Sequence, residues 1–157
     1  HGKEALFENL QKLVKAMKVL KVPIIWMEQV PEKMGPTIPE LSSLLQGESP
    51  IPKITMSCCG ESKFMDALAS TGRKNVLVAG IETHVCVYQT SADLRKAGYE
   101  VQVVADSVSS RTLENKQLGL ERIKLSGATL TSVEMAVFEL VRTSAHPAFR
   151  EILKIVR

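Results

Sequence analysis

The sequence predicts one α/β domain over residues 1–157, built on a doubly wound, mainly parallel sheet with helices on both faces. Short apolar runs alternate with amphipathic helical patterns along the whole chain, and strands separated by helices are joined by parallel crossovers. The run at residues 76–80 is also apolar at nearly every position, as is typical of a strand buried on both faces. These two patterns favour a three-layer, Rossmann-like arrangement.

The first third of the chain predicts a helix, a short strand and a long loop. One helical face carries five apolar residues: Leu6, Leu10, Leu13, Val14 and Met17. Residues 22–27 (VPIIWM) form an apolar run that predicts a strand, and Pro23 is tolerable near its start. Residues 28–52 then contain five prolines and two glycines, with one helical turn at residues 41–45. Loops of this length in compact domains are usually functional.

A short strand and a helix precede the apolar run at residues 76–80. The strand is predicted at residues 53–56. The helix is predicted at residues 61–69, because Glu61 is an acidic residue in its first turn and Gly72 follows its end.

Helices and strands alternate regularly through the second half of the chain. The predicted elements are a helix at residues 85–97, a strand at 101–106, a helix at 112–125 and a strand at 128–131. The two helices end at Gly98 and Gly127. Thr131 and Glu134 have the spacing of a capping box ahead of an apolar helix that continues to residue 141. A final helix is predicted to begin near Pro147.

The composition fits one globular domain and argues against several partner classes. The chain has 157 residues, of which 45% are hydrophobic, and this length is usual for a single domain. Its net charge of +3 comes from interspersed acidic and basic residues, so no basic stripe predicts nucleic-acid binding. No apolar run approaches the roughly 20 residues that span a bilayer, and charged residues interrupt the N-terminal pattern, unlike a signal peptide. We therefore expect neither a membrane nor a nucleic-acid partner.

Cysteine and histidine usage predicts a reducing compartment and no metal site. Three cysteines, two of them adjacent, do not make a disulfide framework, so the cytoplasm is the expected location. The histidines His1, His84 and His146 are scattered, whereas zinc is usually held by three or four clustered ligands. We expect no metal and no cofactor.

Cys86 is the residue that points most directly to chemistry. It follows the predicted strand at residues 76–80 by a few positions, and open α/β sheets bind ligands beyond the carboxyl ends of their strands. A thiol in the first turn of a helix faces positive partial charge, which lowers the thiol pKa. This predicts a nucleophile. The alternative is a small apolar residue that packs the helix on the sheet, as most cysteines do.

Several segments resemble the isochorismatase-like cysteine hydrolases, a superfamily that includes isochorismatase, nicotinamidase and N-carbamoylsarcosine amidase. Residues 80–87 (GIETHVCV) resemble the nucleophile segment of that superfamily, and Lys53 ahead of residues 57–60 (SCCG) resembles its catalytic lysine. Further segments resemble the branch called isochorismatase domain-containing proteins: residues 28–29 (EQ), 35–41 (GPTIPEL), 132–135 (SVEM) and 146–147 (HP).

The resemblance implies a catalytic triad of aspartate, lysine and cysteine. Cys86 would attack a carbonyl or imine-type carbon of a small molecule, Lys53 would support the thiolate, and water would later release the acyl enzyme. The bond cleaved would be a C–N bond of the amide type or a related bond. Without the resemblance, a solvated surface residue is the commoner interpretation of Lys53.

The resemblance also implies details of the pocket. It implies a cis peptide bond between Ile81 and Glu82, and an oxyanion hole formed by the backbone N–H groups of Glu82 and Cys86. Gln29, Thr83 and His84 are the expected substrate-pocket residues. The family further implies a homo-oligomer, a dimer or a tetramer, in which subunits shape one another's pockets. Some nicotinamidases bind a metal through an aspartate and histidines in the loop after their second strand. The corresponding loop here, residues 28–52, contains neither residue type, so nicotinamidase activity is disfavoured.

One part of the implied triad has no match in this sequence. The family's aspartate lies on a central strand that precedes the first helix, whereas this chain opens at His1, at the start of that helix. We expect an open slot in the sheet, and a truncated, a disordered and a partner-supplied strand all remain open as explanations. Asp106 is a weak substitute, because aspartate at a strand end commonly caps a turn, here through Ser107 and Ser109. The alternative function is a catalytically silent protein that serves as an oligomerising or interaction module.

Overall fold

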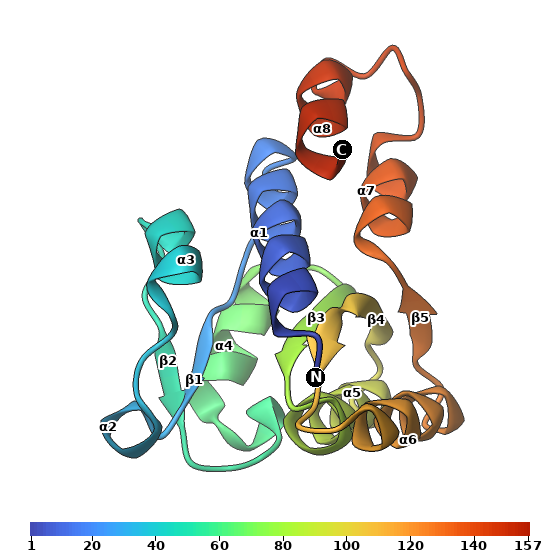
Figure 1. Ribbon diagram of the computed structural model, residues 1–157. Coiled ribbons are helices and arrows are strands. Elements are labelled where there is room, and N and C mark those ends of the chain that lie inside the picture. Colours follow the sequence, from blue (N-terminus) through green and yellow to red (C-terminus); the bar gives the residue numbers. More distant parts are fainter.

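Parallel strands and covering helices make up the structure, a computed structural model that describes residues 1–157 (Figure 1). Strand β1 (Met27–Gln29) pairs with β2 (Ile51–Lys53) in one sheet. The second sheet has the order β3-β4-β5, with β3 at Asn75–Ile81, β4 at Glu100–Ser109 and β5 at Thr129–Thr131. Every pairing is parallel, and the predicted α/β fold class is confirmed.

The helices follow the predicted order. The longer ones are α1 (Lys3–Val19), α4 (Ser62–Ser70), α5 (Tyr88–Lys96), α6 (Leu113–Leu125), α7 (Val133–Val141) and α8 (Phe149–Val156). Short helical segments lie between them: α2 (Pro31–Met34), α3 (Pro39–Ser42), the 3₁₀ turns η1 (Ser43–Leu45) and η2 (Cys58–Gly60), and the π-helical turn η3 (Thr83–Val87). None of the helices is long and apolar enough to span a membrane.

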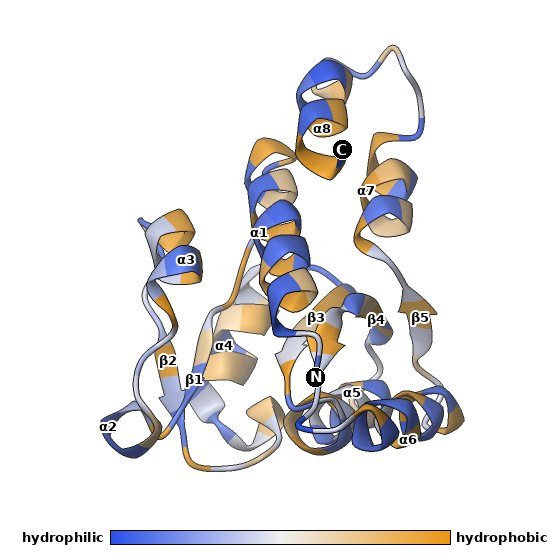
Figure 2. Ribbon diagram, in the orientation of Figure 1, coloured by the Kyte–Doolittle hydropathy of each residue, from blue (hydrophilic) through white to orange (hydrophobic).

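Two hydrophobic clusters, one on each face of β4, hold the layers together. Val104 packs with apolar residues of α1, α7 and α8. Each of these three helices carries both apolar and polar residues (Figure 2). Val101 and Val103 lie in the cluster that includes residues of α4, α5 and α6. Because side chains alternate between the two faces of a strand, this explains why β4 carries buried valines at both odd and even positions.

A large cleft separates the two sheets. Strands β1 and β3 each have one hydrogen-bonded neighbour, and no pairing joins them to each other. The cleft between them has a volume of about 1540 Å³ and is lined mainly by apolar residues, among them Ile25, Met27, Val76 and Val78. This matches the open slot expected from the sequence. It also corrects one expectation, because residues 76–80 are only partly buried where the cleft runs beside β3.

Several element boundaries differ from the predictions for local reasons. Residues 22–26 line the cleft without a strand partner, so the strand expected at residues 22–27 is found at β1 instead. The strand expected at residues 53–56 ends at Lys53, and the chain then folds around the side chain of that residue. β4 continues to Ser109, beyond the expected end at residue 106.

Two predicted helix starts are also corrected. The helix expected from residue 85 begins at Thr83 as the π-helical turn η3, so Cys86 lies inside that turn rather than in the first turn of an α-helix. Helix α7 is capped by Ser132 and not by Thr131. The Ser132 hydroxyl accepts a hydrogen bond from the backbone N–H of Met135 at 3.2 Å.

We expect Ser132→Ala to lower the free energy of unfolding by about 1 kcal/mol, because a backbone N–H at the start of α7 loses its acceptor. Urea unfolding followed by circular dichroism measures the change. Ser70→Ala is the matched control, since the Ser70 hydroxyl only donates to the Ala67 carbonyl at the end of α4. Equal effects of the two substitutions would contradict the capping role.

Candidate active site

Cys86 and Lys53 meet at the carboxyl-terminal edge of the two sheets. Lys53 is the last residue of β2, and Cys86 lies in the turn that follows β3. Parallel strands end at the same edge, which is where open α/β sheets bind ligands. The structure brings the two side chains together, with 3.7 Å between Lys53 Nζ and Cys86 Sγ.

Lys53 is buried, so the interpretation as a solvated surface lysine is wrong. Only 5% of the surface of Lys53 is exposed to solvent. Its ammonium group donates to the backbone carbonyls of Thr55 and Met56, each at 2.9 Å, and to Gln29 Oε1. All three oxygens are neutral, and Lys53 forms no ion pair with a carboxylate. A buried charge that lacks a counter-charge favours an anionic neighbour, and Cys86 Sγ is the remaining side-chain atom in contact with the ammonium group.

Gln29 completes the contact between the lysine and the cysteine. It lies opposite Lys53 in the register of β1 and β2. Its Oε1 accepts from Lys53 and lies 4.0 Å from Cys86 Sγ, while its Nε2 donates to the Ile54 carbonyl at 3.0 Å. Gln29 therefore sits at the predicted pocket, held in a single orientation from both ends of its amide.

The backbone turns sharply between β3 and Cys86. Gly80 has a φ of +107°, a conformation that side-chain-bearing residues rarely adopt, and the Ile81–Glu82 peptide bond is cis. The Glu82 carbonyl then accepts from the N–H groups of Val85 at 3.1 Å and Val87 at 3.2 Å. The second of these bonds spans five residues and makes the turn π-helical, a form that is frequent at functional sites.

Thr83 and His84, two of the expected pocket residues, do not line the cleft that contains Cys86 and Lys53. Thr83 is fully buried, and its hydroxyl has no hydrogen-bond partner. His84 Nδ1 lies 3.0 Å from Ser110 Oγ, on the side of α6. Of the three expected pocket residues, only Gln29 joins the lysine and the cysteine.

The other two cysteines lie beside the site, which the sequence did not indicate. Cys58 lines the same cleft as Cys86, and its backbone N–H donates to the Thr90 hydroxyl at 2.9 Å. Thr90 is four residues after Cys86, one helical turn along the chain. Burial raises the pKa of the Cys58 thiol, against smaller opposing effects of the Thr90 hydroxyl and the Lys53 charge. Burial likewise raises the pKa of the Cys59 thiol.

Asp106 does not substitute for the missing carboxylate. Its two carboxylate oxygens accept from the backbone N–H of Val133 at 3.0 and 3.3 Å, so it caps the start of α7. The expectation that Asp106 caps a turn through Ser107 and Ser109 is therefore wrong, because both serines lie in β4. The donor to the Asp106 carboxylate comes from α7, and the sequence alone could not show that α7 lies next to Asp106. No three or more His, Cys, Asp or Glu side chains are grouped so that they could hold a metal ion.

Comparison with known proteins gives consistent relatives. The model of the isochorismatase domain family matches residues 1–135. The chain is 40% identical over 154 residues to the secreted isochorismatase effector Isc1 of Phytophthora sojae, covering 92% of this chain and 71% of that protein. It is 39% identical over 147 residues to isochorismatase domain-containing protein 2A of Mus musculus, covering 93% of this chain and 69% of that protein.

A solved structure agrees with these relatives. The structure of MAR1 ribonuclease from Caenorhabditis elegans superposes with a TM-score of 0.91 at 34% sequence identity, covering 98% of this chain and 79% of that chain. The family match includes the turn that contains Cys86 as well as β2 and its terminal lysine. The chain therefore belongs to the isochorismatase-like hydrolase family.

Proposed function

We propose that this protein is a cysteine-dependent hydrolase that cleaves a C–N bond of the amide type, or a related bond, in a small molecule. The observation that carries the proposal is the 3.7 Å contact between the buried Lys53 ammonium group and the Cys86 thiol. The other partners of the ammonium group are neutral oxygens, so its charge is free to stabilise negative charge that develops at the Cys86 site during the reaction.

The reaction proceeds through a covalent thioester. A base takes the proton of Cys86, and the thiolate attacks the carbonyl carbon of the substrate. The backbone N–H groups of Glu82 and Cys86 stabilise the oxyanion of the tetrahedral intermediate. The C–N bond breaks, and the amine leaves with a proton. Water then attacks the thioester, which releases the acid and restores the Cys86 thiol.

Residues 1–157 supply no carboxylate that could act as the general base for Cys86. No carboxylate contacts Lys53 or Cys86, and Asp106 is committed to α7. The cleft between β1 and β3 opens beside both residues, and Gln29, Lys53 and Cys86 are among its lining residues. A parallel strand in that cleft would pair with both free edges, and its carboxyl end would reach the lysine and the cysteine. We propose that such a strand carries the aspartate that the family uses.

The contacts of Cys86 favour a broad class of substrates. Nothing charged other than Lys53 contacts Cys86, so the proposal favours a small neutral amide or ester. The solved relative from Caenorhabditis elegans is named a ribonuclease, so RNA belongs in any substrate panel. The even distribution of charge in this chain does not favour RNA.

We predict that Cys86 is alkylated before Cys58 and Cys59. Burial raises the pKa of the latter two thiols, so their thiolates form only at higher pH, whereas Cys86 contacts an ammonium group. Iodoacetamide labelling at mildly acidic pH, followed by peptide mapping, gives the order. Lys53→Met should slow the labelling of Cys86 selectively. Earlier labelling of Cys58 or Cys59 in the unmodified chain would count against the nucleophile assignment.

We predict weak but measurable hydrolysis by residues 1–157 on a panel of small amides and esters, and none by Cys86→Ala. The matched control is Cys59→Ala, which removes a thiol that does not line the cleft and should leave the rate unchanged. RNA is included as a separate arm of the panel.

A version extended at its N-terminus by a strand that carries an aspartate should be faster by ~10²–10⁴, the usual worth of a general base. The same extension with asparagine at that position separates the effect of the base from that of a filled cleft. Equal rates with and without the aspartate would contradict its proposed role. A complete lack of turnover in the extended version would favour the alternative, a silent interaction module.

We also predict a homo-oligomer. Helix α7 buries Val133, Val137 and Val141 but leaves Met135 and Leu140 exposed by 55% and 46%. Apolar side chains at exposed helix positions are typical of subunit contacts. Multi-angle light scattering at micromolar concentration should give a multiple of the 17.3 kDa chain mass, and Met135→Lys should lower it. A monomer at that concentration would reject the prediction.

A further inference from the structure

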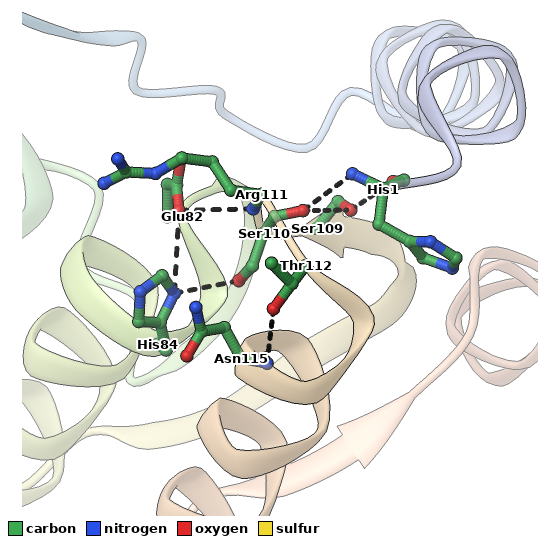
Figure 3. A network of polar contacts seen from close by, with 8 residues as sticks. All are labelled: His1, Glu82, His84, Ser109, Ser110, Arg111, Thr112 and Asn115. Atoms are coloured by element: carbon green, nitrogen blue, oxygen red, sulfur yellow. Dashed lines mark hydrogen bonds and ion pairs between the residues drawn. The ribbon is translucent and has the colours of Figure 1, made fainter.

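A polar cluster ties the turn that contains Cys86 to the loop between β4 and α6 (Figure 3). The carboxylate of Glu82 lies 3.3 Å from Arg111 Nε and accepts from the backbone N–H of Arg111 at 3.4 Å. It also lies 3.6 Å from His84 Nδ1, which contacts the Ser110 hydroxyl at 3.0 Å. Glu82 and His84 thus face the same short loop from two positions of one turn.

Glu82 is connected to the turn by its backbone as well as to the loop by its side chain. Its carbonyl accepts the N–H groups of Val85 and Val87, the two neighbours of Cys86. Its carboxylate does not cap this helical turn, because no side-chain cap bond is formed there. The position of the Glu82 backbone is therefore coupled to both neighbours of Cys86 through two backbone hydrogen bonds.

Helix α6 fixes the same turn from a third point. A side chain at Gly119 would place its Cβ 2.8 Å from the backbone N and Cα atoms of His84, so α6 lies directly against the backbone of the turn. The start of α6 is itself held by the Thr112 hydroxyl, which accepts from the N–H of Asn115 at 3.2 Å. The loop and the helix thus form one wall behind the nucleophile.

We propose that Glu82, through Arg111, is a positioning residue that holds the Cys86 turn against α6 and so keeps the thiol within reach of Lys53. Its side chain acts through its contacts with Arg111 and does not need to touch the substrate. The Arg111 side chain is 81% exposed, and such an ion pair adds little to global stability. Its effect is therefore expected in the placement of the thiol more than in unfolding. The consequence for turnover rests on the proposed hydrolase function, whereas the consequence for thiol reactivity does not.

The test compares Glu82→Ala, Glu82→Gln and Arg111→Ala by the rate at which iodoacetamide modifies each of the three thiols. Glu82→Ala should slow Cys86 by about tenfold, since misplacement by an ångström can cost about 10²-fold in an oriented reaction. Glu82→Gln should restore much of the rate, because its amide oxygen still accepts from the N–H of Arg111. Arg111→Ala, on an exposed side chain, should fold and give a smaller selective loss. Glu100→Gln is the matched control, because it removes an ion pair with Arg95 away from the site.

The outcomes distinguish a positioning role of Glu82 from a general effect on stability, and they also distinguish it from the proposed hydrolase function. A loss confined to Cys86, with an unchanged unfolding midpoint and recovery in Glu82→Gln, supports the proposal. Equal slowing of all three thiols, or no slowing of Cys86 in either Glu82→Ala or Arg111→Ala, overturns it. In the extended, active version the same variants should lower kcat and leave KM unchanged. If that version proves inactive while the selective loss of Cys86 labelling persists, the hydrolase proposal fails and the positioning role stands.

Discussion

The buried ammonium group of Lys53 constrains the whole carboxyl-terminal edge of the two sheets. Removing a charge from water is costly unless polar partners replace the solvent, and Lys53 has two backbone carbonyls, one side-chain amide and a thiol. To supply them, the chain after β2 must fold back around the amine, and β1 must present Gln29 in register with Lys53. The short strands β1 and β2 therefore serve the site as much as the sheet.

The same edge is incomplete in a way that the two clusters of the core do not repair. β4 is paired on both sides and buried on both faces, so the central layer is well formed around it. β1 and β3 expose one edge each to a cleft with apolar walls, an arrangement that favours binding of a further strand. Geometry and chemistry thus point to one place, because the segment that would close the sheet would also reach Lys53 and Cys86.

Much of this architecture was predictable from sequence, and the errors have identifiable causes. The strands and helices from residue 61 onward were predicted because apolar periodicity is strong there, and the resemblance of residues 80–87 singled out the turn that contains Cys86. Residues 22–26 look like a strand but have no partner, and pairing is a tertiary property that local pattern does not contain. For the same reason, the bond from Asp106 to α7 and the contact of Gly119 with His84 could not be predicted, since each joins elements distant in sequence.

Because one fold hosts many functions, the residues around the site determine the biological role within this family. A relative at 40% identity is named a secreted effector and a solved relative is named a ribonuclease, so the expected cytoplasmic location remains a prediction. The residues beside Cys86 that most limit its chemistry are Lys53 and Gln29, which are held from several sides. The cleft and the proline-rich loop at residues 28–52 form the rest of the pocket wall, and Met34 there is 73% exposed. Differences in substrate between relatives are therefore expected to arise in this wall, while the proposed common chemistry rests on the lysine–cysteine contact.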